Sequence, residues 1–141
     1  MWFLLMDYTK ARKMNQFEFQ GQQYTIEINY WESTKVLPEY GIFLGTMFTD
    51  EEAAAKTMQN LGLDDEAALR LAWKYVEPTT SMSEETFYKT MNGEQLDKFR
   101  EAFWAAVVNF SGALKKNLLV ELWSEFKKEL KKASKNPTLD K

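Results

Sequence analysis

The chain lacks cysteine and histidine altogether, and these two absences exclude many familiar chemistries. Without cysteine there is neither a thiolate nucleophile nor a disulfide. Without histidine there is no Ser-His triad and no side chain that ordinarily shuttles protons at neutral pH. Zinc sites built from these two residues are excluded as well. What the 141 residues do contain is 45% hydrophobic and 15% aromatic side chains, which is enough apolar surface to fold one domain.

The apolar opening of the chain, residues 1–6, is too short to be a targeting or membrane segment. Asp7 interrupts it, no basic residue precedes it, and no small-residue cleavage site follows it. A signal peptide needs about 7–15 apolar residues in its core and a membrane span about 20. We therefore expect a cytoplasmic protein that does not cross a membrane.

A well-patterned segment begins at Met14, directly after the basic residues Lys10, Arg12 and Lys13. This order favours Met14 as the natural start, with residues 1–13 as an upstream extension or an artificial addition. The alternative, that residues 1–13 add a strand or helix that covers the core, stays open.

Charge is distributed unevenly along the chain, although the total is only −3. Residues 1–114 carry 10 basic and 17 acidic side chains, a net charge of −7, whereas residues 115–141 carry 8 lysines and 4 acids, a net charge of +4. An acidic body repels a phosphate backbone, and the basic end lacks the arginines that bind phosphates and bases in bidentate fashion. We expect no nucleic-acid partner.

The hydrophobic pattern predicts a mainly helical α+β fold. Residues 17–30 alternate apolar and polar with a period of two around Gly21, which predicts a β-hairpin. Helices are expected after Pro38, after possible capping boxes at residues 49–52 and 81–84, after Asp64, and from Glu94 and Ala113. We predict a hairpin packed on a bundle of about five helices, a single domain over residues 14–132, and a polar disordered tail at residues 133–141.

Two acidic clusters and one aromatic stripe have structural interpretations. The clusters at residues 50–52 and 64–66 stand at expected helix starts, where acids cap the helix dipole, and neither has the spacing of a calcium loop. The stripe of Phe99, Phe103 and Phe110, with Trp104 beside it, is typical of a core rather than of a ligand cavity. We expect no catalytic residue, no metal and no cofactor, so an enzyme is not predicted.

The last helix is the predicted interaction element. Its apolar line repeats every four residues from Leu114 to Leu130, and lysines occupy the opposite face. Such a helix can pack on its own domain, lie on an anionic membrane or dock on a partner, and self-association is included in the last case. We choose the partner interpretation, with packing as the open alternative and no membrane role, and select four anchors: Leu119, Trp123, Phe126 and Leu130. If these are hot spots, replacing Trp123 and Phe126 with alanine weakens association, whereas a lower melting temperature alone places them in the core.

The layout over residues 14–135 resembles the tail assembly chaperones of long-tailed bacteriophages and prophages. The features that carry the resemblance are the start at Met14, the immediate strand pair of residues 17–28, the helices that follow, and the lysine-rich end. The resemblance implies a non-enzymatic protein of the infected bacterial cytoplasm. It would bind the tape measure protein and keep it soluble until the tail tube forms, would self-associate into rings or spirals, and would be absent from the mature virion.

A small helical regulator or adaptor is the alternative function. Such a protein binds one protein partner with fixed stoichiometry, as a monomer or compact dimer. The oligomeric state distinguishes it from an assembling chaperone.

Overall fold

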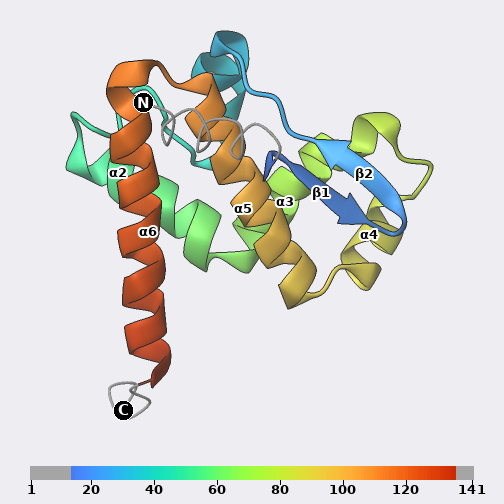
Figure 1. The fold of residues 1–141 in the computed structure, drawn as a ribbon. Helices are drawn as coiled ribbons and strands as arrows, with labels where there is room; N and C mark the ends of the chain where they lie inside the picture. Colours follow the sequence, from blue (N-terminus) through green and yellow to red (C-terminus); the bar gives the residue numbers. More distant parts are fainter. Residues whose placement is uncertain (1–13, 136–141) are drawn as a thin grey trace, which may run out of the picture.

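The computed structural model describes residues 14–135, which form the mainly helical α+β domain that the sequence predicts (Figure 1). The expectations for residues 1–13 and for 136–141 lie outside the described residues. In chain order the elements are the strands β1 (Gln16–Phe19) and β2 (Gln22–Thr25), the short helical turns η1 (Glu32–Val36) and η2 (Leu37–Tyr40), the helix α2 (Glu51–Met58), the turn η3 (Gln59–Leu63), the helix α3 (Asp65–Val76), the turn η4 (Glu77–Thr79), and the helices α4 (Glu84–Thr90), α5 (Gly93–Phe110) and α6 (Ala113–Lys135).

The predicted β-hairpin is present at the start of the domain. β1 and β2 pair in antiparallel register, with Phe17 opposite Tyr24. The two residues that join them, Gln20 and Gly21, both have positive φ angles, of 51° and 78°, which is the geometry that matches the twist of a two-residue hairpin. Phe17, Phe19, Tyr24 and Ile26 of the alternating pattern are buried, whereas Tyr30 at its end is exposed. The strand ladder ends at Thr25, earlier than the alternation suggests.

The helical turns η1 and η2 lie before and around Pro38, so the prediction of a helix that begins after this proline is wrong. Pro38 stands in the first turn of η2, where its missing N–H would have no helical partner in any case. Gly41 then ends the helical segment in the left-handed conformation, at φ 76°.

The helix caps differ in position from the predicted capping boxes. Asp50 rather than Thr49 caps α2, because its carboxylate accepts from the backbone N–H groups of residues 52 and 53. Ser83 rather than Ser81 caps α4. A complete capping box forms at Asn92 and Gln95, where the sequence indicates only a helix end. In each of these helices, the capping residue is the one whose side-chain oxygen accepts from the backbone N–H group two or three residues further along the chain.

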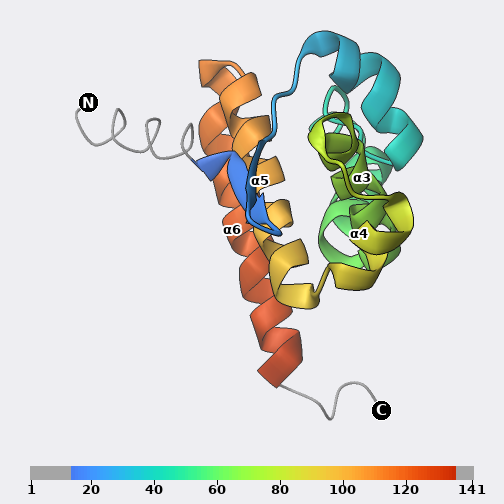
Figure 2. The same cartoon turned by 90° about the vertical axis from the view of Figure 1, so that its right-hand side faces the viewer.

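Helix α5 forms the centre of the core, since it contacts β1, α3 and α6 (Figures 1 and 2). The rings of Phe99 and Phe103 lie 6.0 Å apart and are fully buried. Phe17 of the hairpin packs edge-on against Phe99, at 5.4 Å between centroids. Phe99, Phe103 and Trp104 of the aromatic stripe are therefore core, as expected, whereas Phe110 at the end of α5 is only half-buried and lines a surface groove.

Helix α6 runs antiparallel to α5 and ends at Lys135, three residues beyond the predicted end at Lys132. Its last turns extend past the start of α5 (Figures 1 and 2). Within residues 14–135, no helix combines the length and the apolar character that crossing a membrane requires.

Candidate docking surface

Two tryptophans join α6 to α5. The ring of Trp123 stacks on that of Trp104, with 5.1 Å between centroids and an interplanar angle of 17°. Both indole N–H groups have acceptors: Trp104 donates to the carbonyl oxygen of Leu119 at 3.0 Å, and Trp123 donates to Glu101 at 3.1 Å. These contacts fix the inner part of α6 on the domain.

The four predicted anchors do not share one exposed face. Leu119 and Trp123 are only 2% and 7% exposed, because both lie against α5. Phe126 is half-buried and stacks on Trp123, and its ring also lies close to Gly62. Leu130 is 36% exposed on the outer part of the helix. For Leu119 and Trp123 this supports the packing alternative, and a partner-binding role for the four residues stays a prediction.

A groove of about 480 Å³ opens at the end of the domain where the chain passes from α5 to α6. We call it the apolar groove. Its floor is buried, and its rim consists of exposed and half-buried side chains, most of them apolar or small. The floor contains Ser33, Leu44, Met47, Val107 and Leu119, and the rim contains Tyr30, Thr34, Gly45, Phe48, Phe110, Ser111, Gly112, Ala113, Leu114 and Lys115.

Three large apolar side chains on the rim are exposed to solvent. Leu114 is 95% exposed and Tyr30 74%, and Phe48 is exposed as well. Tyr30 makes an edge-on contact with Phe110, with 4.7 Å between ring centroids, which places its ring at the rim. A buried apolar floor with exposed aromatic side chains and polar groups at its edge is typical of protein-docking sites.

The sequence did not predict the apolar groove, although Leu119 belongs to it. The rim residues come from three separate segments, so no local pattern unites them. One feature of the sequence indicates exposed apolar surface here: Tyr30 and Trp31 are adjacent aromatic residues at the end of an alternating stretch. Successive side chains of a strand point to opposite faces, so the two cannot both face the core. Both are exposed.

Two polar clusters on the described residues have structural roles. Arg100 is buried and donates to the Leu61 carbonyl oxygen at 2.6 Å, while its other nitrogens pair with Asp65 and Asp97. The three interactions join η3, the start of α3 and α5. Because its charge is fully partnered, Arg100 needs no ligand to explain its burial.

The second cluster joins η1 to α3. Glu32 accepts from Lys74 at 2.6 Å and from the Tyr75 hydroxyl at 3.3 Å. Burial raises the pKa of Tyr75, and the neighbouring carboxylate of Glu32 raises it further. Tyr75 therefore stays a neutral donor at every physiological pH, as a structural hydrogen bond requires.

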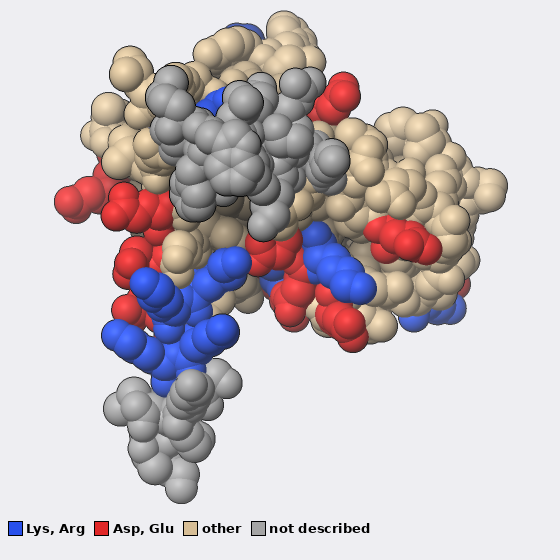
Figure 3. All heavy atoms as spheres, in the orientation of Figure 1, with Lys and Arg blue, Asp and Glu red and all other residues tan. Residues whose placement is uncertain are grey.

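No group of three or more potential metal ligands occurs within the part of the chain that the structure describes. The charged side chains instead form separate areas. Lysines gather over the outer part of α6 and acids gather beside them over α5 (Figure 3). The charge asymmetry of the sequence is therefore also an asymmetry of the surface.

Comparison with known proteins adds no assignment: no protein-family model, no curated protein and no solved structure matches this chain.

Proposed function

We propose that this chain is a non-enzymatic tail assembly chaperone that binds the tape measure protein and keeps it soluble in the bacterial cytoplasm. The observation that supports this most directly is the apolar groove, with Leu114 and Tyr30 exposed on its rim. A long helical partner with apolar stripes needs such a surface to cover it. The resemblance of residues 14–135 to that family supplies the identity of the partner.

The test is co-expression of the full chain with the tape measure protein of the same phage or prophage. The soluble fraction of the tape measure protein is measured with the natural chain and with the double variant Tyr30→Ser, Leu114→Ser. Both positions are highly exposed, so the variant keeps the fold and removes only apolar rim surface. We expect the soluble fraction to fall severalfold.

A matched control is Leu63→Ser, since Leu63 is an exposed leucine of η3 that does not line the groove. It is expected to leave the soluble fraction unchanged. Equal solubility with both variants would contradict the role of the groove. A tape measure protein that needs no chaperone, together with a fixed one-to-one complex with another protein, would favour the adaptor alternative.

A further inference from the structure

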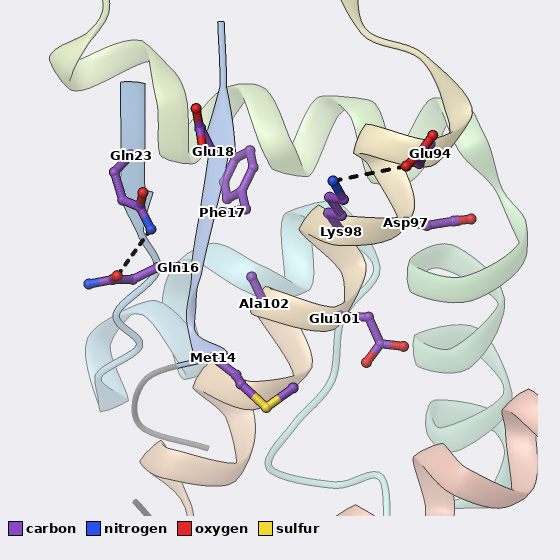
Figure 4. A pocket seen from close by; sticks show the side chains of 10 residues that line it. All are labelled: Met14, Gln16, Phe17, Glu18, Gln23, Glu94, Asp97, Lys98, Glu101 and Ala102. Atoms are coloured by element: carbon purple, nitrogen blue, oxygen red, sulfur yellow. Dashed lines mark hydrogen bonds and ion pairs between the residues drawn. The ribbon is translucent and has the colours of Figure 1, made fainter. Parts of the chain in front are cut away.

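A second hollow, of about 560 Å³, lies between β1 and the first half of α5 (Figure 4). We call it the acidic groove. Four of its lining residues are acids and one is a lysine, a net charge of −3. The acids are Glu18, Glu94, Asp97 and Glu101, the lysine is Lys98, and the other lining residues are Met14, Gln16, Phe17, Gln23 and Ala102.

Two of the four acids are only weakly compensated within the described residues. Asp97 pairs with Arg100 at 2.9 Å and Glu101 with Lys127 at 3.1 Å. Glu94, in contrast, pairs with Lys98 at 4.0 Å, the longest ion pair among the residues described, and Glu18 has no ion pair with any of them. The wall formed by β1 and the first turn of α5 therefore attracts a further cation.

The outer end of α6 supplies the opposite charge. Residues 127–135 contain five lysines and one glutamate, a net charge of +4. Within residues 14–135, the last ion pair that α6 makes with another element is the one between Lys127 and Glu101. The eight residues after it, about 12 Å of helix, extend past the domain (Figures 1 and 2). Among the residues described, Lys128 and Lys132 pair only with glutamates one turn earlier on the same exposed helix, which is a weak interaction.

We propose that two copies of this chain pair by laying the lysine-rich outer end of α6 of each copy in the acidic groove of the other. The lysines and the acids lie side by side on one face of the molecule (Figure 3). When both halves of a complementary pair lie on one face, a two-fold axis satisfies both contacts at once and the assembly closes as a dimer. An apolar contact is available too, because Leu130 of the α6 end is 36% exposed and Met14, which lines the groove, is 52% exposed.

This pairing goes beyond the proposed function and does not depend on it, since it uses neither the apolar groove nor a tape measure protein. It also differs from a closed ring or an open spiral, in which the two complementary surfaces lie on different faces of each copy. The contact is electrostatic, so salt weakens it.

The first measurement is light scattering after size-exclusion chromatography of the full chain, over a concentration series and at several salt concentrations. We expect a dimer at about 50 mM NaCl and a dissociation constant at least tenfold weaker at about 300 mM. A monomer at every concentration, or species that grow beyond a dimer, would overturn the proposal.

Charge reversal then locates the contact. One variant carries Lys128→Glu, Lys131→Glu and Lys132→Glu, and the other carries Glu18→Lys and Glu94→Lys. Each is expected to be monomeric at low salt, while a mixture of the two restores a dimer, because the reversed helix end of one now complements the reversed groove of the other. A mixture that stays monomeric, or a single variant that still dimerises, contradicts the assignment.

The control variant Lys35→Glu, Lys56→Glu, Lys89→Glu changes the net charge by the same amount as the α6 variant. Two of its lysines also lose an exposed ion pair within one helix, as in the α6 variant. It is expected to dimerise normally. Circular dichroism checks that helix content is unchanged in all variants.

The basic residues Lys10, Arg12 and Lys13 offer another cation source for the acidic groove. The full chain with Lys10→Ser, Arg12→Ser and Lys13→Ser is expected to dimerise as the natural chain does. If this variant alone removes the dimer while the α6 variant keeps it, the occupant is the N-terminal segment and the proposal fails.

Discussion

Helices α5 and α6 carry similar apolar stripes, yet α5 is largely buried and α6 is largely exposed. α5 has 10 buried residues among 18. α6 has 23 residues, and among those whose burial is described only Leu119 and Trp123 are buried. The difference arises because α5 is covered by the hairpin, α3 and α6, whereas α6 has α5 as its main neighbour. A stripe shows which face of a helix is apolar, and the neighbours decide how much of that face is covered.

The largest expected effect is in α5. Phe103→Ala removes a fully buried ring that packs on Phe99 and Tyr75. We expect the free energy of unfolding to fall by about 4 kcal/mol, since the ring leaves a cavity. Urea denaturation measures this, with Val120→Ala on the exposed face of α6 as the control and an expected change below about 0.5 kcal/mol. A loss of less than about 1 kcal/mol at Phe103 would mean that α5 is not the centre of the core.

A smaller effect is expected for Trp123→Ala in α6. The change removes the stack on Trp104 and leaves Glu101 without one donor. We expect a loss of about 3 kcal/mol, because the site borders solvent and can partly relax. The control is Trp31→Ala, which removes the same ring from an exposed position.

Association measured on the same protein separates the two roles that the sequence leaves open for Trp123. A lower stability with unchanged self-association or partner binding, measured below the unfolding transition, assigns Trp123 to the core. Weakened association without a loss of stability would restore it as a partner anchor.

Most of the fold follows from local patterns in the sequence. The hairpin was predictable because residues 17–20 and 24–30 each alternate apolar and polar, and Gly21 between them permits a tight turn. The core face of α5 was predictable because Phe99 and Phe103 repeat at helical spacing. The segment around Pro38 was not, because a proline is equally compatible with a helix start and with the first turn of a helix already begun.

The surfaces were much harder to predict than the fold. The apolar groove combines Tyr30, Phe48 and Leu114, which are distant in sequence, so only tertiary packing brings them together. The buried position of Trp123 depends on Trp104, another distant residue. The charge asymmetry, in contrast, was visible in the residue counts, since helix α6 keeps its lysines together.

The contact between α6 and η3 gives a still smaller expected effect. A Cβ atom at Gly62 would collide with the ring of Phe126, so Gly62→Ala pushes the ring away from its place on Trp123. We expect a cost of about 1–2 kcal/mol from this overpacking. Gly93→Ala is the control, because nothing lies within 4 Å of a Cβ atom there. The cost at Gly62 should largely vanish in a Phe126→Ala background, and a cost that persists there would mean that the two residues are not in contact.

The smallest effect on stability is expected at the start of α6. Leu114 is 95% exposed, so Leu114→Ser removes almost no buried surface and should change the free energy of unfolding by less than about 0.5 kcal/mol. If Leu114→Ser instead destabilises the fold by more than about 1 kcal/mol, the first turn of α6 is covered in solution and the contrast with α5 is weaker than the structure indicates. If stability is kept while tape measure solubility falls, the same side chain is dispensable for folding and required for binding. That combination is what separates a docking surface from a core, and neither urea denaturation nor co-expression shows it alone.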